Sequence, residues 1–130
     1  MTVLAEVAAR TAAASPLWRA ALVCEDAQPR FAETCPQQHL LGVEMIYEGH
    51  LLHRGRSRLF SQADPDLALL TGDHLYAAGL REICASGDLA AVGALAELIS
   101  ACARDQGDGR LDTDEALWDA TVAGLAEGGA

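Results

Sequence analysis

The chain has 130 residues, the size of a single domain that can bury about two-thirds of its unfolded surface. Its formal net charge is −10, and its nine basic residues are all arginines. An acidic surface of this kind disfavours binding to nucleic acid and to anionic lipid headgroups. We therefore expect one domain over residues 1–130, with no nucleic-acid partner.

The first fifteen residues predict no targeting segment, because they lack a basic start and because Glu6 interrupts their apolar run. No run of about 20 apolar residues follows, so we expect no membrane span. The four cysteines have no Cys-x-x-Cys spacing, and Cys84 and Cys102 fall on apolar faces of expected helices. These features predict a cytoplasmic protein with buried free thiols.

Helices are favoured over sheets, because alanine and leucine dominate and aromatic residues make up 5% of the chain. Ser15-Pro16 and Asp64-Pro65 each place a capping residue before a proline at the first helical position, and Asp88 caps a further helix. Gly87 is expected to end the helix that Asp64 begins.

The expected helices, in chain order, cover residues 2–13, 16–25, 36–53 and 65–85, then one that begins at 89 and one over 112–126. Residues 29–35 are expected to form a turn or loop, and residues 105–109 a flexible loop. The pattern predicts an all-α fold, a compact bundle of six or seven helices.

Two pairs of polar residues occupy the expected helix 36–53. Glu44 and Glu48, at i and i+4, indicate a solvated helix face. His50 and His53 could begin a metal site, but no carboxylate completes a Glu-x-x-His pair, and partly exposed histidines are the preferred interpretation. Residues 104–115 are spaced like a calcium loop, although a cation, an arginine, stands at its first ligand position. We therefore expect no metal site.

Arg54, Arg56 and Arg58 lie within five positions and follow the end of the same helix. Guanidinium groups at a helix C-terminus suit the negative end of the helix dipole. They also suit bidentate binding of a diphosphate or a carboxylate. Two interpretations remain open: an anion-binding cluster, and structural pairing with acidic neighbours.

Three segments together resemble the trans-isoprenyl diphosphate synthase family: LLHRGRSRLF at 51–60, DLALLTGDHLYAAGLREI at 66–83 and GDLAAVGALAELISACARDQGDG at 87–109. Residues 51–53 are similar to the lead-in to the family's aspartate-rich motif, 54–56 to its arginine loop, and 70–75 to its Gly-Asp helix. The resemblance implies part of the isoprenoid synthase fold.

The family's aspartate-rich motif is missing, because the sequence passes from His53 directly to Arg54 where Asp-Asp-x-x-Asp would stand. The carboxylates of that motif hold the Mg²⁺ ions that neutralise the leaving diphosphate. The sequence has no second aspartate-rich motif either. The resemblance therefore implies a protein that is not an enzyme by itself, with no catalytic residue, metal ligand or cofactor.

In the family, the Gly-Asp helix and the helix after it form the subunit interface. The resemblance therefore implies an interface within residues 65–105, formed by Leu70, Gly72, Asp73, His74, Tyr76, Leu95 and Ile99. Gly72 would let two helices approach closely between subunits. Alternatively, it packs against another helix of the same bundle.

Three functions remain open on these grounds. The leading prediction is a non-catalytic prenyl-synthase-like protein that forms a homodimer, or a heterodimer as the small subunit beside a catalytic prenyl synthase subunit. The second is a small helical binding protein for a diphosphate or other anionic ligand. The third is a scaffold that keeps the fold alone.

Overall fold

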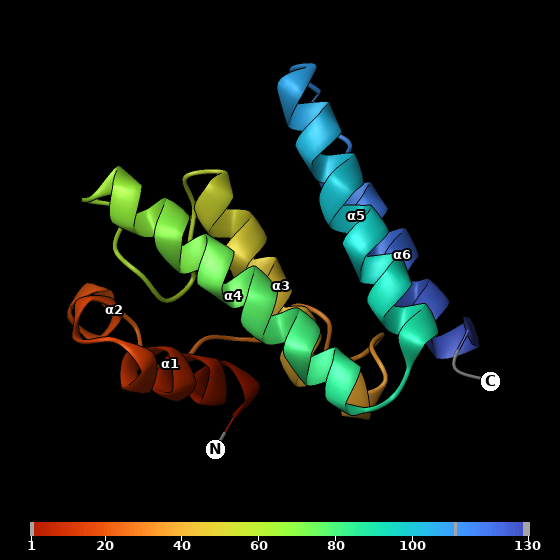
Figure 1. The fold of residues 1–130 in the computed structure, drawn as a ribbon, viewed down its shortest axis with the longest axis horizontal. Helices are drawn as coiled ribbons and strands as arrows, with labels where there is room; N and C mark the ends of the chain where they lie inside the picture. Colours follow the sequence, from red (N-terminus) through yellow and green to blue (C-terminus); the bar gives the residue numbers. More distant parts are fainter. Residues whose placement is uncertain (1, 111, 129–130) are drawn as a thin grey trace.

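The structure, a computed structural model, describes residues 2–110 and 112–128, which form helices and no strand (Figure 1). The predicted all-α fold is confirmed. The helices are α1 (Val3–Ala14), α2 (Pro16–Ala21), α3 (Gln37–His53), α4 (Pro65–Ala85), α5 (Leu89–Gly107) and α6 (Asp114–Gly128). None of the described helices is long and apolar enough to cross a membrane.

The helix caps predicted at Ser15, Asp64 and Asp88 are confirmed. The Ser15 side chain accepts a hydrogen bond from the backbone N–H of the second residue of α2, and Asp64 accepts from the first turn of α4. Asp88 accepts from the N–H of Ala91 in α5 at 3.0 Å. Gly87 separates α4 from α5 with a φ of 81°, a conformation that glycine adopts without strain.

Two helix ends differ from the prediction by more than two residues. α2 ends at Ala21, well before residue 25, because the chain leaves the helix to pair with a distant segment. The N–H groups of Val23 and Cys24 donate to the carbonyl of Leu59, and Leu22 forms an isolated antiparallel bridge with Phe60. α5 continues to Gly107 and so includes part of the predicted loop 105–109.

α3 is the central helix, and 13 of its 17 residues are buried. On one side it packs into a core with α5 and α6, where Trp118 and Val122 are buried. On another side it packs into a second core with α1 and α4, to which Leu4 and Leu75 contribute. Figure 1 shows α5 and α6 side by side as a hairpin that projects beyond the rest of the bundle.

α3 and α4 pack closely along an antiparallel contact lined by glycines. A Cβ atom placed on Gly79 would lie 2.7 Å from the carbonyl oxygen of Gly42. Further along the same contact, a Cβ atom on Gly72 would lie 3.0 Å from the carbonyl oxygen of Gly49. Side chains larger than hydrogen would force the helices apart, so these glycines fix how α4 sits on the central helix.

Candidate functional site

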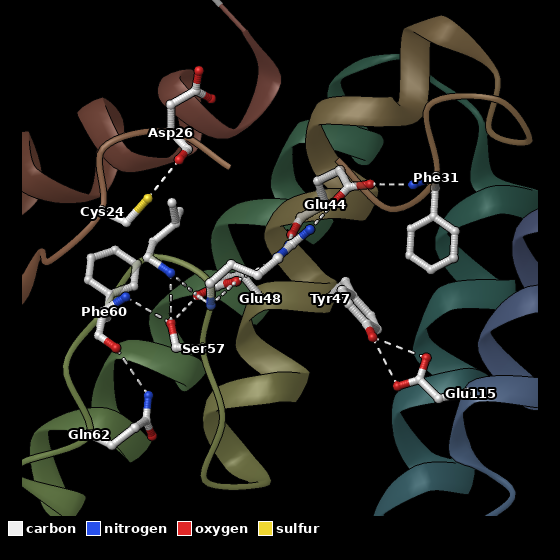
Figure 2. A network of polar contacts seen from close by, with 12 residues as sticks. Cys24, Asp26, Phe31, Glu44, Tyr47, Glu48, Ser57, Phe60, Gln62 and Glu115 are labelled. Atoms are coloured by element: carbon white, nitrogen blue, oxygen red, sulfur yellow. Dashed lines mark hydrogen bonds and ion pairs between the residues drawn. The ribbon is translucent and has the colours of Figure 1, made fainter. Parts of the chain in front are cut away.

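α3 carries two fully buried carboxylates, Glu44 and Glu48 (Figure 2). Arg58, in the segment after α3, turns back onto both of them. Its Nε lies 2.9 Å from Oε1 of Glu48, and its Nη1 lies 2.5 Å from Oε1 of Glu44. The interpretation of Glu44 and Glu48 as a solvated face is therefore wrong, because both side chains are buried among the neighbouring elements of the bundle.

The remaining oxygens of the two carboxylates accept hydrogen bonds from nearby donors. The backbone N–H of Phe31 donates to Oε2 of Glu44 at 2.7 Å. The Ser57 hydroxyl and the N–H groups of Arg58 and Leu59 donate to Glu48. Buried carboxylates are tolerated only when charge and hydrogen bonds compensate their lost hydration, and this network provides both.

The network also determines the charge state of its cation. Burial by itself would lower the pKa of Arg58, but the attraction and the hydrogen bonds of Glu44 and Glu48 outweigh it and raise the pKa above its usual value. Arg58 is thus a permanent positive charge held inside the fold by two negative ones.

Arg54 also forms its polar contacts with residues of its own chain. Its side chain is 7% exposed, and its Nε lies 2.9 Å from Oδ2 of Asp114 at the start of α6. It further donates to the carbonyl of Cys102 at 2.8 Å and to Oε1 of Gln106 at 2.5 Å, both on α5. Arg54 therefore joins the end of α3 to both helices of the α5–α6 hairpin.

Arg56 differs from its two neighbours. Its side chain is 59% exposed, and its Nη2 lies 3.6 Å from Oε1 of Glu115. Gly55, with a φ of 72°, separates the buried Arg54 from the exposed Arg56, and both arginines reach carboxylates in the first turn of α6. Structural pairing thus accounts for Arg54 and Arg58. Anion binding by the three arginines stays a prediction, with Arg56 as its exposed member.

One open hollow borders the arginine-containing segment at Gly55 and has a volume of about 380 Å³. Its walls come from the end of α3, the segment that follows it and the start of α4: Leu52, His53, Gly55, Gln62, Pro65, Ala68 and Leu69. These residues are mostly apolar and include no arginine. The hollow therefore lacks the guanidinium groups that would bind an anion.

The predicted interface residues fall into two groups in the structure. Leu70 and Asp73 are exposed on α4, with Leu70 60% exposed. Leu95 on α5 is fully buried in the core, and Ile99 is half-buried against it. His74 is half-buried and its ring lies 4.2 Å from that of Trp18 on α2. The outward group alone is accessible to a second chain.

Gly72 is buried against α3 of its own chain, where a Cβ atom would meet the His53 ring at 2.6 Å. The alternative interpretation, packing within the same bundle, therefore describes Gly72. Tyr76, half-buried beside it, packs on Gly49 and places its ring 4.7 Å from that of His53, edge to face. Asp73 also lies at this contact, with its Oδ1 2.9 Å from Nε2 of His53.

The prediction for histidines and cysteines is wrong in part. His50 is 1% exposed rather than partly exposed, because the α5–α6 hairpin covers it. All four cysteines are free thiols, as predicted, but Cys84 is exposed on α4. Cys84 lies on the solvent-exposed face of α4. Its exposure could not be predicted, because α4 has apolar residues around most of its circumference.

The chain matches no family model, no curated protein and no solved structure. The resemblance to prenyl diphosphate synthases therefore depends on the three sequence segments alone.

Proposed function

We propose that the chain is a non-catalytic, prenyl-synthase-like protein that functions by pairing with a second helical chain. The partner is either a copy of itself or a catalytic prenyl diphosphate synthase subunit, for which this chain is the small subunit. The observation that carries the proposal is an exposed apolar stripe along α4.

The stripe consists of Leu70, Ala77 and Cys84, which are all exposed and follow one another at intervals of seven residues. Leu69, 48% exposed, widens it at its N-terminal end. A seven-residue repeat keeps side chains on one seam of a helix, which is the pattern along which a second helix packs. The stripe therefore suits a partner helix that lies along α4.

Charged residues alternate with the apolar ones along this stripe. Asp73 and Arg81 stand between Leu70, Ala77 and Cys84, and both are exposed. Opposite charges at different positions along a helix give a second helix that pairs with it a preferred direction and register. This arrangement favours a specific partner over nonspecific association.

The absence of catalysis is supported by how the central carboxylates are used. Glu44 and Glu48 are bound by Arg58 and by backbone N–H groups, so their oxygens are already engaged. The Asp-Asp-x-x-Asp motif does not follow His53 in the sequence. Prenyl transfer needs free carboxylates to hold Mg²⁺ at the leaving diphosphate.

Two measurements test the proposal. The purified chain, incubated with Mg²⁺ and with allylic and homoallylic diphosphates, is expected to form no elongated prenyl product. Light scattering is expected to give a mass above that of a monomer, either alone or after addition of a full-length prenyl synthase from the same organism. Elongated product would contradict the non-catalytic part, and a monomer under both conditions would contradict the pairing.

A further inference from the structure

A second buried polar cluster lies where α3 meets the α5–α6 hairpin. It contains His50 from α3, Cys102 from α5 and Asp114 from the start of α6. All three residues are buried, and one donor atom from each lies within 4.8 Å of the others. The three donors, nitrogen, sulfur and oxygen, thus converge on one point from three helices.

The cluster holds buried polar atoms that lack partners. Among the described residues, neither Nε2 of His50 nor Oδ1 of Asp114 has a hydrogen-bond partner, although the side chains are 1% and 5% exposed. The indole N–H of Trp118, whose ring lies 5.5 Å from that of His50, is likewise unpartnered there. A buried polar atom without a partner destabilises the fold unless something binds it.

We propose that His50, Cys102 and Asp114 form a binding site for one Zn²⁺ ion, with Nε2, Sγ and a carboxylate oxygen as its ligands. Imidazole, thiolate and carboxylate are the ligand types that zinc takes in proteins. Zinc ligands at bond lengths of about 2.0–2.3 Å lie roughly 3.5 Å from one another. Nε2 of His50 is 3.8 Å from Oδ2 of Asp114, so small side-chain movements close the cluster around an ion.

Arg54 holds the carboxylate in place for this purpose. Its Nε donates to Oδ2 of Asp114, the oxygen that lies 3.8 Å from Nε2 of His50, and Oδ1 has no hydrogen-bond partner among the described residues. Partners of this kind outside the ligand shell commonly orient the groups that bind a metal.

The protonation states set how the ion binds. Burial, and then the nearby Arg54, lower the pKa of His50 to about 4, so its ring is a neutral ligand at pH 7. Burial, and then Asp114, raise the pKa of Cys102 to about 12, so Zn²⁺ must displace the thiol proton. One proton is released to solvent, the S–H bond is replaced by a Zn–S bond, and no oxidant or reductant takes part.

A bound Zn²⁺ ion would be a structural cross-link. The ion would connect the central helix to both helices of the hairpin, alongside the contacts of Arg54. A ligand that binds the folded chain alone stabilises it, by about 2.7 kcal/mol at a concentration one hundred times its Kd.

The test uses the full chain after removal of metal by a chelator. Addition of Zn²⁺ is expected to raise the melting temperature by several degrees and to saturate at one ion per chain. Co²⁺, which occupies zinc sites and reports its ligands, is expected to show the near-ultraviolet thiolate-to-metal charge-transfer band. Absence of the temperature shift and of the band would overturn the proposal and would indicate that water molecules form hydrogen bonds with these polar atoms.

Variants identify the ligands. Cys102→Ser and His50→Gln are expected to abolish the band and the temperature shift. The matched control replaces the other thiols together (Cys24→Ser, Cys35→Ser and Cys84→Ser) and is expected to keep both. A band that survives Cys102→Ser, or that disappears in the control while its circular dichroism stays helical, would also overturn the proposal. If Cys102→Ser does not fold, the control decides, because Cys102 is then the single thiol.

Discussion

Arg58 donates from its Nε to Oε1 of Glu48 across 2.9 Å, so a residue of the segment after α3 neutralises a carboxylate at the centre of the bundle. The same guanidinium also reaches Glu44 one turn earlier on α3. The arginine-containing segment therefore stabilises the fold from within, because it closes the bundle over its central helix.

Replacement of Arg58 by methionine is expected to lower the free energy of unfolding by about 3–5 kcal/mol, because it leaves Glu44 and Glu48 buried without a counter-charge. Arg56→Met is the matched control. Its side chain is 59% exposed, so the expected change is within about 0.5 kcal/mol. Urea denaturation followed by circular dichroism measures both. Equal, small changes in the two variants would show that the buried network contributes little.

The glycine contact between α3 and α4 predicts opposite effects for two Gly→Ala substitutions. Gly79→Ala is expected to destabilise the chain, because its Cβ would lie 2.7 Å from the backbone oxygen of Gly42. Gly93→Ala on α5 is expected to stabilise it by up to about 1 kcal/mol, because its Cβ meets nothing within 4 Å and alanine favours helix. Melting temperatures that move in the same direction would contradict this packing.

The chain has two tyrosines, so their ionisation can be followed by absorbance. Burial, and then the hydrogen bond to Glu115, raise the pKa of Tyr47 to about 12, and burial raises the pKa of Tyr76 as well. Unfolded tyrosine ionises near pH 10, so between these values the folded state binds more protons and its stability falls as pH rises.

Little tyrosinate is therefore expected at pH 10 while circular dichroism remains helical, and ionisation should coincide with unfolding at higher pH. Tyr47→Phe should halve the final tyrosinate signal. Half-ionised tyrosines at pH 10 in a fully helical chain would show that Tyr47 and Tyr76 are accessible to solvent.

Pyrophosphate at millimolar concentration is expected to leave the melting temperature unchanged, because Arg54 and Arg58 are bound by internal carboxylates. A thermal shift assay measures this, with sulfate at equal ionic strength as the control. A rise in melting temperature that Arg56→Ala removes would instead favour the alternative function, binding of a diphosphate-like anion.

The helices could be read from the sequence because their signals are local. Ser15, Asp64 and Asp88 each accept a hydrogen bond from the first turn of the helix that follows them. Each cap involves residues that are close together in the sequence, so the sequence alone is enough to predict it. The end of α2 could not be predicted in this way. It depends on pairing between Val23 and Leu59, which lie far apart in the sequence.

The burial of Glu44 and Glu48 could not be predicted for a related reason. A carboxylate pair at i and i+4 looks the same on a solvated helix and on one whose counter-charge arrives from a later segment. The one available signal was the apolar residues around them in α3, such as Leu40, Val43, Ile46 and Leu51. The cluster of His50, Cys102 and Asp114 is likewise invisible in the sequence, because its members come from three helices.

The central claim is that α4 pairs with a second chain through its exposed stripe, and sedimentation velocity over a range of concentrations tests it most directly. Gly72 is unsuited to the purpose, because it is buried within its own chain. Leu70→Arg changes the stripe without touching the core, and Leu17→Arg, at a 65% exposed position on α2, is the matched control. We expect wild type and Leu17→Arg to sediment as dimers at tens of micromolar, or to co-sediment with a catalytic synthase subunit, and Leu70→Arg to sediment as a folded monomer. A wild type that stays monomeric alone and with the synthase, or a Leu70→Arg variant that pairs as well as the control, would contradict the account.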